Sequence, residues 1–323
     1  MAISQAGRIG KAGLAARIRL GDSLFAGLVG AAALTVLLVI LGLFYELTGD
    51  AWIAIEKFGL EFVWTTEWNP PQEVFGAGAL VVGTIITSLA ALILATAVGL
   101  MVALYLTQVA PPFVARPLSY MVELLAAIPS VVYGLWGIFV LGVFIRDSFG
   151  PKIVVLLGWI PIFDGTPLIT GLLSAILILS IMILPTVTAV SRDVLAAVPG
   201  SQREGVLALG ATRWEMIRMA VLPYARSGVL GAAILGLARA VGETLAVTMV
   251  IGNRRAIPHT IFDAAYTMPS IIANEFSEVE NKMHEAALLE VGLLLLVITF
   301  VINVIARLLV WRVTKGQRAV VQE

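Results

Sequence analysis

The sequence predicts an all-α, polytopic membrane protein with six transmembrane helices. Of its 323 residues, 59% are hydrophobic and only 13% are charged, whereas roughly 25% of the residues of a typical soluble domain are charged. Several apolar stretches reach the length of about 20 residues that a helix needs to cross a bilayer. The uneven distribution of lysine and arginine then predicts the side of the membrane on which each connecting segment lies.

Six apolar stretches account for the predicted spans. A further apolar run, residues 153–160, ends at Pro161 and is far shorter than a span of about 20 residues, so we expect a short external or re-entrant element there. The predicted spans cover residues 23–48, 77–107, 118–145, 167–190, 227–252 and 286–311. The chain is therefore organised as one outlying span followed by a core of five spans.

The positive charges predict the orientation. With the N-terminus inside, the inner segments hold 14 of the 21 lysine and arginine residues, the outer segments hold 6, and Arg239 lies within a span. Cytoplasmic segments of membrane proteins retain positive charge, so both termini and the charged stretch of residues 201–225 are predicted to be cytoplasmic. The net charge of zero gives no indication of a nucleic-acid partner, which would require a clustered basic excess.

The two larger outer segments have different characters. In residues 49–76, five acidic residues are interleaved with six aromatic ones, which is typical either of an aromatic belt at the membrane interface or of a docking surface for an external protein. Residues 253–285 are expected to form a solvated, charged loop, where His259 and His284 lack the converging ligands of a metal site. Glu290, near the outer end of the sixth span, is expected to extend to the interface.

The cytoplasmic stretch of residues 201–225 is predicted to form two short helices. Gly210 suits the left-handed conformation that ends a helix. Thr212 then fits an N-cap, and Glu215 three residues later completes a capping box. Pro223 ends the second helix or bends it into the next span. The side chains that this arrangement exposes are Arg203, Glu204 and Trp214.

The spacing within this stretch follows a wider pattern. Glu204 is followed by Gly210 six residues later and by Leu222-Pro223, which resembles the EAA loop of ABC importer permeases, E-A-A-x-x-x-G followed by nine residues and I-x-L-P. Gly205-Val206 replaces the alanine pair, and Ala220 replaces the isoleucine. The resemblance implies a coupling helix inserted in a groove of a cytoplasmic ATP-hydrolysing subunit. The residues expected to serve this coupling are Glu204, Gly210, Thr212, Arg213, Trp214 and Pro223.

The fifth predicted span carries a longer motif. Residues 236–253 read G-L-A-R-A-V-G-E-T-L-A-V-T-M-V-I-G-N, which resembles the signature G-x-x-R-A-x-G-E-T-x-A-V-T-x-x-x-G-N of PstC-type phosphate permeases. The partner permease of such an importer shares the R-A-x-G-E-T core, so the continuation through Ala246-Val-Thr248 and Gly252-Asn253 favours the PstC type. The likeness implies the type I ABC importer permease fold in a plasma or inner membrane.

The same resemblance implies an assembly and a division of the chain. The expected partners are a second phosphate permease subunit, two cytoplasmic ATPase subunits, an external phosphate-binding protein, phosphate itself and membrane lipid. Residues 1–76 would hold the cytoplasmic N-terminus, the first span and the acidic, aromatic periplasmic segment. Residues 77–312 would form the transmembrane domain with its coupling loop, and residues 313–323 a cytoplasmic tail.

Ionisable residues within the spans are candidates for the translocation path. Arg239 and Glu243 are four residues apart and would share one face of a continuous helix. A charge at the bilayer centre costs about 2.5–3.5 kcal/mol, so both side chains should face protein or water. Either the two form an internal salt bridge, or Arg239 binds phosphate while Glu243 orients Arg239 and weakens its binding of the anion. The family resemblance implies a translocation role for both. Glu123 is a further ionisable residue of the third span and a candidate for the path. Pro129, shortly after it, frees a backbone carbonyl that Ser130 can satisfy, which predicts either a functional or a merely packed kink. The expected translocation residues are Arg239, Glu243, Glu123 and Thr244.

Small residues accompany this charged pair along the same predicted helix. Glycine and alanine let the backbones of neighbouring membrane helices approach closely. The residues concerned are Gly228, Gly231, Gly236, Ala238 and Gly242.

No motif in the sequence is typical of an enzyme. The phosphate loop G-x-x-x-x-G-K-[ST] is absent, because Gln5 and Ala12 stand at essential positions around Gly10-Lys11. ATP and magnesium are therefore expected on the partner ATPase, with no cofactor or metal on this chain. Two alternatives remain: an ABC permease for another small anion or an amino acid, and an ion-driven secondary transporter, which inverted repeats would favour.

Overall fold

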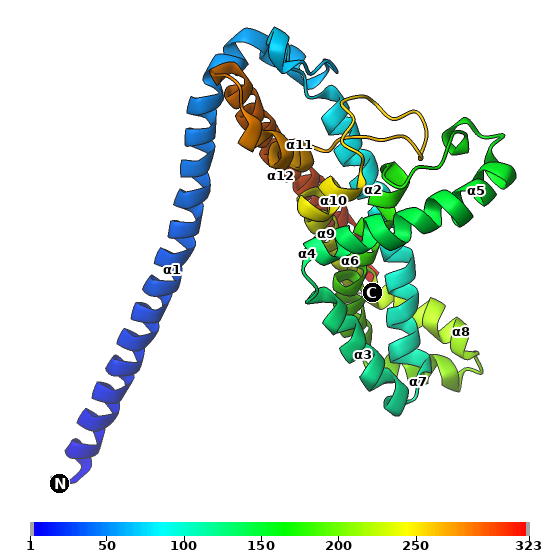
Figure 1. Cartoon of the computed structure of the whole chain (residues 1–323). Coiled ribbons are helices and arrows are strands. Elements are labelled where there is room, and N and C mark those ends of the chain that lie inside the picture. The colour runs from blue at the N-terminus through cyan, green and yellow to red at the C-terminus, as the bar shows by residue number, and fades with distance from the viewer. Residues whose placement is uncertain (1–2, 321–323) are drawn as a thin grey trace. The chain divides into compact units, whose positions relative to one another are not determined.

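The structure, a computed structural model, describes the backbone of residues 3–320 and the side chains of residues 22–312. The described residues form helices and connecting loops without a β-strand. The chain divides into two compact units, Met1–Asp50 and Ala51–Glu323 (Figure 1). The side chains of the predicted cytoplasmic tail, residues 313–323, lie outside the described residues.

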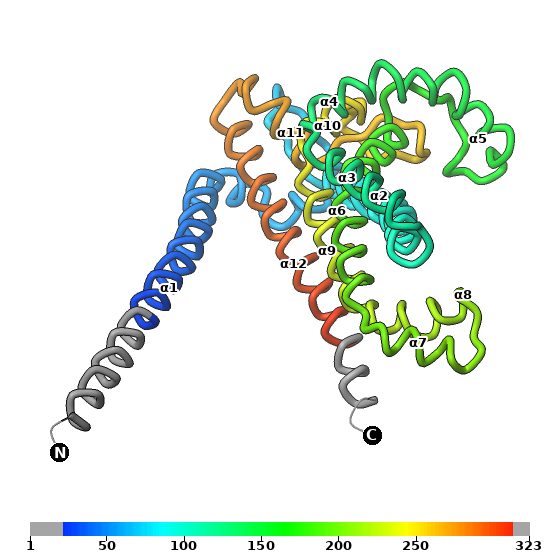
Figure 2. The backbone as a smooth tube through the Cα atoms, turned by 90° about the horizontal axis from the view of Figure 1, so that it is seen from below, coloured from blue at the N-terminus to red at the C-terminus, as the bar shows by residue number. Residues whose placement is uncertain are grey.

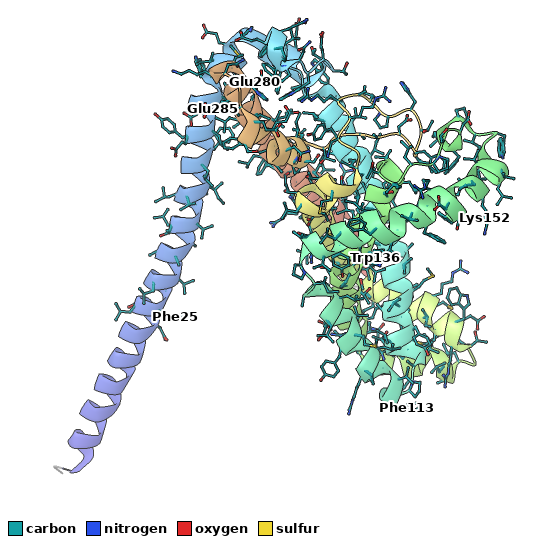
Figure 3. The ribbon with its side chains drawn as sticks, in the orientation of Figure 1. Phe25, Phe113, Trp136, Lys152, Glu280 and Glu285 are labelled. Atoms are coloured by element: carbon teal, nitrogen blue, oxygen red, sulfur yellow. The ribbon has the colours of Figure 1, made fainter. Side chains whose placement is uncertain are left out.

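The first unit is a single helical segment. It belongs to α1, which extends from Ile3 to Phe58. Its apolar side chains are exposed on all sides, Leu34 and Phe25 among them, and Figure 3 shows Phe25 directed away from the helix axis. Such a helix suits a lipid environment, and residues Asp22–Val63 are long and apolar enough to cross a bilayer. The first predicted span is confirmed.

Four long helices make up most of the second unit. Buried aliphatic side chains such as Ile178 and Leu179 form a core between α2, α6, α9 and their neighbours. α6 packs against both α2 and α9, and α12 packs against α9. The four helices are α2 (Gly78–Leu104, continued by η3, Tyr105–Val109), α6 (Leu172–Ala196), α9 (Leu222–Val241) and α12 (Lys282–Val320).

Small residues permit these helices to approach closely at two of the predicted positions. A Cβ atom on Gly236 would lie 2.8 Å from the side chain of Val187, and one on Gly228 would collide with Val194. Both contacts join α9 to α6, as the small-residue pattern predicts. Gly231, by contrast, has no neighbouring atom within 4 Å of such a Cβ in this chain. That face of α9 is therefore open to a partner or to lipid.

The third predicted span, residues 118–145, is not one continuous helix. A break at residues 127–129 separates two helical segments, Pro112–Ala126 and Ser130–Leu157, which are bent by 93°. The physical reason is Pro129, which disfavours the helical conformation at Ile128. The segments comprise α3 (Pro112–Ala126), α4 (Ser130–Trp136), the π-helical η4 (Gly137–Gly142) and η5 (Ile145–Phe149), and α5 (Gly150–Leu157).

The short apolar run predicted at residues 153–160 lies at the far end of this bent pair. It coincides with most of α5 and the turn before η6 (Pro161–Phe163). Figure 1 shows α5 projecting sideways from the other helices, and Figure 3 places Lys152 near its tip. The run therefore does not form a span of its own.

The fifth predicted span, residues 227–252, is also interrupted. The helix ends at Val241, and residues 242–244 separate it from α10 (Leu245–Val250). At its other end the helix extends further than predicted, because it runs without a break from Arg213. Pro223 neither ends nor breaks this helix. The residues before it form the π-helical η7 (Ile217–Val221), and a π-helical turn changes the local hydrogen-bond pattern of the backbone.

Shorter elements close the two ends of the second unit. α7 (Gly200–Ala208) and α8 (Arg213–Met216) form a hairpin at one end, and α11 lies at the other (Figures 1 and 2). The elements at the α11 end are η1 (Gly59–Val63), η2 (Pro70–Gln72), α11 (Met268–Glu275) and η8 (Phe276–Glu278). In the described part of the chain, five helices can cross a membrane and the bent pair can form a sixth span.

Candidate translocation site and coupling hairpin

Arg239 lies in the last turn of α9 and is half-buried. Its Nη1 donates a hydrogen bond to Oγ1 of Thr186 on α6, at 3.3 Å. Among the described side chains, no carboxylate forms an ion pair with Arg239. An arginine within a membrane-spanning segment must face protein, water or an anion. Arg239 therefore retains donors that no acidic residue of this part of the chain occupies.

The predicted pairing of Arg239 with Glu243 is wrong for this structure. The four-residue spacing brings two side chains together only on a continuous helix, and α9 ends two residues before Glu243. Glu243 Oε1 instead accepts a hydrogen bond from the backbone N–H of Ala246, at 3.4 Å. Glu243 thus caps the start of α10 rather than neutralising the arginine.

Thr244 completes the connection between the two helices. Its hydroxyl donates to the carbonyl of Gly242, at 3.3 Å. Its own carbonyl accepts from the N–H of Thr248 at 2.9 Å and from the Thr248 hydroxyl at 2.7 Å. These bonds satisfy backbone groups that the interruption leaves free, as a broken membrane helix requires.

The two interrupted spans meet close to Arg239. α4 packs against α10, and Gly134 makes this approach possible because a Cβ there would lie 2.5 Å from the sulfur of Met249. The hydroxyl of Tyr133 donates to the carbonyl of Leu125 across the first break, at 2.8 Å. Tyr133 shares one buried core with Ala240, the residue next to Arg239, and with Ala246 of α10. The two breaks and the arginine therefore belong to one region, an arrangement that suits a binding site in a transporter.

Glu123 does not contact Arg239 but pairs with another arginine. It lies on α3 and pairs with Nη1 of Arg192 at 3.0 Å, while Arg192 also contacts Asp193 at 3.0 Å. Along α6, Arg192 is six residues beyond Thr186, or about 9 Å at the helical rise per residue. A cavity of about 480 Å³ adjoins Glu123 and is lined by Ala115, Arg116, Ser119, Tyr120, Glu123 and Arg192. Glu123 thus belongs to a separate polar cavity.

Exposed apolar side chains accompany the Arg239 region. Trp136 on α4 is 43% exposed, and Figure 3 shows where it lies on that helix. Other exposed apolar residues of α3, α4, α9 and α10 are Met121, Leu124, Val132, Leu235 and Leu245. The four helices therefore leave apolar surface uncovered by the second unit.

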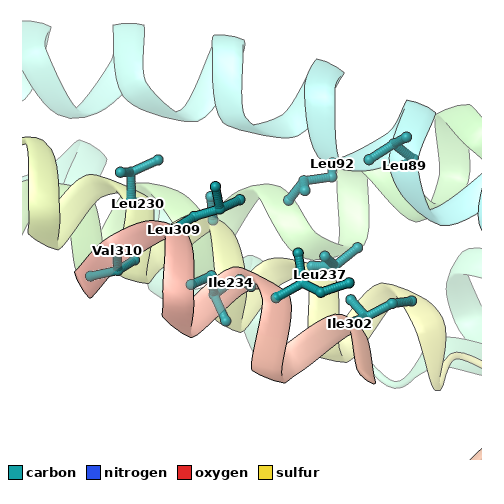
Figure 4. Close-up of a pocket in the computed structure, with 11 residues that line it drawn as sticks. Leu89, Leu92, Leu230, Ile234, Leu237, Ile302, Leu309 and Val310 are labelled. Atoms are coloured by element: carbon teal, nitrogen blue, oxygen red, sulfur yellow. The ribbon is translucent and has the colours of Figure 1, made fainter. Parts of the chain in front are cut away.

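A groove between α2, α9 and α12 is unsuited to an anion. Its volume is about 330 Å³ and its lining is aliphatic, as Figure 4 shows with Leu92, Leu237 and Ile302. An anion would lose its hydration there and gain no hydrogen-bond donor. The groove is therefore distinct from the candidate site at Arg239.

The hairpin of α7 and α8 has the predicted elbow and cap. Gly210 adopts φ +86°, which L side chains rarely adopt. Thr212 Oγ1 accepts from the N–H of Glu215 at 3.3 Å, and Glu215 Oε2 accepts from the N–H of Thr212 at 2.8 Å. The predicted two-helix shape is confirmed.

The hairpin displays some side chains and anchors others. Glu204, Arg213 and Trp214 are exposed, Trp214 at 65%. Arg203, expected to be exposed, is half-buried and donates through Nη2 to the carbonyl of Leu195 at 2.8 Å. Met216, Ile217 and Val221 form one core with Ala103 of α2 and Leu195 of α6. The hairpin is thus fixed to the helices while its tip remains free to contact another protein.

A buried polar cluster at the α11 end was not predicted. Glu275 is 4% exposed. Its Oε1 accepts from Arg255 Nε at 2.9 Å, and its Oε2 accepts from Trp68 Nε1 at 2.9 Å. His284 Nε2 lies 3.1 Å from Oε2, and the His284 ring stacks on Phe75. We name Trp68, Arg255, Glu275 and His284 the outer cluster. The expectation that the acids of this loop are solvated is wrong for Glu275.

Glu290 also departs from its predicted environment. It is 7% exposed rather than extended to the interface, and its Oε2 lacks a hydrogen-bond partner among the described residues.

His259 is joined to the rest of its loop by its backbone N–H, which donates to Asp263 at 2.8 Å. No group of three or more metal-binding side chains occurs among the residues that the structure describes.

Known proteins resemble this chain over most of its length. A family model described as "Binding-protein-dependent transport system inner membrane component" matches residues 95–315. The "Phosphate transport system permease protein PstC" of Mesorhizobium japonicum is 42% identical, and the match covers 92% of each chain. The protein of the same name from Pasteurella multocida is also 42% identical, with 88% of this chain and 90% of its own length covered.

Solved structures share the fold. The permease-containing structure of a bacterial alginate ABC transporter with its pentasaccharide-bound periplasmic protein gives a TM-score of 0.59 at 16% identity, covering 89% of this chain and 95% of that one. The inward-facing MetNI methionine ABC transporter gives 0.53 at 20% identity, covering 72% and 93%. The chain is a multi-pass inner-membrane permease that belongs to the family of binding-protein-dependent transport system inner membrane components, with PstC-type permeases as its relatives.

Proposed function

We propose that this chain is a membrane subunit of an ATP-driven phosphate importer. The observation that carries the proposal is Arg239, a cation in a membrane-spanning segment without a carboxylate partner among the described side chains, located where two interrupted helices meet. Guanidinium N–H groups match the oxygens of phosphate in geometry and charge. The relatives named as phosphate transport permeases support the choice of anion.

The exposed surfaces suit the partners of such an importer. A second permease would cover the apolar side chains near Arg239 and complete the path. An external phosphate-binding protein would dock at the α11 end, and two cytoplasmic ATPase subunits would receive the α7–α8 hairpins of the two permeases. ATP and magnesium would bind to those ATPases and not to this chain. In this proposal both termini of the chain would lie in the cytoplasm.

One continuous helix supplies a mechanical link from the hairpin to the site. The helix from Arg213 to Val241 has 29 residues, which corresponds to about 43 Å at 1.5 Å per residue. Trp214 lies near its first turn and Arg239 in its last. ATP binding that moves the hairpin would shift this helix as a rigid element, and the interruption after Val241 would absorb the displacement. Glu204, Gly210, Thr212 and Pro223 would serve this coupling by shaping the hairpin.

The other predicted translocation residues take more limited roles in this proposal. Glu243 and Thr244 would hold the backbone at the interruption and keep α10 in place beside Arg239. Glu123, paired with Arg192, would line the inner part of the path through the polar cavity. Arg239 alone would supply the charge that attracts the anion at the meeting of the two broken spans.

Uptake by the reconstituted importer tests the proposal. Arg239→Ala is expected to reduce phosphate uptake at least about 100-fold, since a charge-assisted bidentate contact is lost, while Arg239→Lys retains part of the rate. Phosphate uptake by Arg239→Ala at the parental rate would overturn the assignment. Excess unlabelled sulfate or amino acid that competes as well as phosphate would instead support the alternative of another substrate.

A further inference from the structure

Thr186 is the described threonine whose hydroxyl accepts a hydrogen bond from an arginine. A buried threonine in a membrane helix ordinarily directs its hydroxyl hydrogen to the carbonyl four residues earlier. Thr84, Thr107 and Thr248 do so, with their bonds to Leu80, Ala103 and Thr244 measuring 2.7, 2.8 and 2.7 Å. Thr186 makes no such bond among the described residues, and neither do Thr96 and Thr188. Of these three, only Thr186 has its Oγ1 hydrogen-bonded, and the donor is Arg239.

The packing of α6 against α9 places Thr186 and Arg239 together. Gly236 is one turn before Arg239, and its missing side chain lets α9 approach Val187, the residue next to Thr186. Thr186 itself is half-buried, so part of the residue remains accessible. The contact is therefore fixed by two helix backbones and does not depend on a flexible loop.

The hydrogen-bond capacity of the pair remains partly unused. A threonine hydroxyl carries one donor and two acceptor positions. Its acceptance from Arg239 leaves the O–H hydrogen without an acceptor among the described residues. The guanidinium has five N–H donors, and only one bond to a described side chain occupies them. Both groups thus present free donors from the same place, as an oxyanion site requires.

We propose that Thr186 forms the anion site together with Arg239. This inference rests on the proposed function and assigns a second residue to the same site. The Oγ1 atom of Thr186 accepts from Nη1 of Arg239 and so orients the guanidinium. The O–H hydrogen of Thr186 donates to an oxygen of the bound phosphate. Thr186 therefore takes the orienting role that the sequence pattern suggested for Glu243, but with a neutral group that leaves the positive charge undiminished.

The test compares Thr186→Val, Thr186→Ser and the control Thr188→Val. Thr188 is two residues further along α6, is 1% exposed, and its Oγ1 lacks a partner among the described groups, so its hydroxyl contributes no contact to the site. Each variant is reconstituted as the complete importer with saturating phosphate-loaded binding protein. The measured quantities are phosphate uptake, ATP hydrolysis and the thermal stability of the complex.

Thr186→Val is expected to lower phosphate uptake about 10- to 100-fold, the factor for a lost hydrogen bond to a charged group. ATP hydrolysis stimulated by the binding protein should persist, so that fewer phosphate ions are transported per ATP. Thr186→Ser should recover uptake to within about threefold of the parent, and Thr188→Val should match the parent. A merely structural threonine would instead lower stability, uptake and hydrolysis together.

Two outcomes separate this inference from the proposed function. Parental uptake by Thr186→Val beside a severe loss in Arg239→Ala would overturn the role of Thr186 alone, whereas parental uptake by Arg239→Ala would overturn the site itself. If Thr186→Val does not assemble, Thr186→Ala takes its place in the comparison with Thr186→Ser. An equal loss in the alanine and serine variants, or an equal loss in Thr188→Val, would contradict the proposal.

Discussion

Arg239 and Glu275 are two charged residues that the second unit holds in opposite ways. Glu275 is almost completely buried and interacts with Trp68, Arg255 and His284. Arg239 is half-buried and makes one hydrogen bond to a neutral hydroxyl. Both carboxylate oxygens of Glu275 already accept from neighbouring side chains, whereas the guanidinium of Arg239 keeps donors that can bind a ligand. The outer cluster is therefore structural, and the Arg239 region is arranged to bind.

Removal of Glu275 should give the largest loss of stability. Glu275→Ala leaves Arg255, Trp68 and His284 without their acceptor, and loss of one partner from a buried ion pair costs about 3 kcal/mol or more. Because Arg255 is partly exposed, we expect a value near the lower end of that range. Thermal unfolding of the purified protein, with limited proteolysis of the outer segments, measures the effect.

Glu280→Ala and Arg239→Ala are the controls for this comparison. Glu280 is exposed and lies on the connection between η8 and α12 (Figure 3), so its removal should leave the unfolding temperature almost unchanged. Arg239→Ala should reduce uptake far more than stability. Equal destabilisation by Glu275→Ala and Glu280→Ala would show that the outer cluster does not hold the outer segments together.

The sequence predicts structure that depends on neighbouring residues better than structure that depends on residues far apart in the chain. The Thr212 cap depends on a residue only three positions away, and its spacing indicates the local structure directly. The bond between Trp68 and Glu275 joins residues 207 positions apart, and an acid in an outer loop is otherwise typical of a solvated surface. Only packing of α11 against α12 and the outer segment brings these residues together.

For a similar reason, the sequence indicates the break in the third predicted span more clearly than the break in the fifth. Pro129 marks the break between α3 and α4 through a local steric effect, but the residue alone indicates neither the 93° angle nor the contact of α4 with α10. No proline marks the end of α9, where Gly242 is followed by residues that cap the next helix. The motif around Arg239 predicts a charged residue within the fifth span, but the assumption of a continuous helix gives Arg239 the wrong neighbour.

A substitution at the contact between the two interrupted spans is expected to have an effect of intermediate size. Gly134→Val would place side-chain atoms against Met249 and Ala246, and such overpacking costs about 1–3 kcal/mol. We expect uptake to fall together with the unfolding temperature, because displacement of α4 disturbs both breaks. Gly231→Ala is the matched control, since nothing lies within 4 Å of its Cβ position. Parental uptake by Gly134→Val would show that α4 and α10 need not remain in contact.

The smallest expected effect concerns Asp263 in the outer loop, and it depends on pH. Partial burial opposes ionisation of Asp263, but N–H groups of Thr260 and His259 donate to its carboxylate, and together with the Arg254 charge they lower its pKa below the ordinary 3.8. A lowered pKa stabilises the folded protein above the ordinary value, and this contribution is lost as pH falls through the folded value. Asp263→Asn should therefore cost about 1 kcal/mol at pH 7 and progressively less below pH 3.8. Thermal unfolding at pH 7 and pH 3, with exposed Glu278→Gln as control, measures the difference; a cost for Asp263→Asn that grows as the pH falls would contradict the assigned hydrogen bonds.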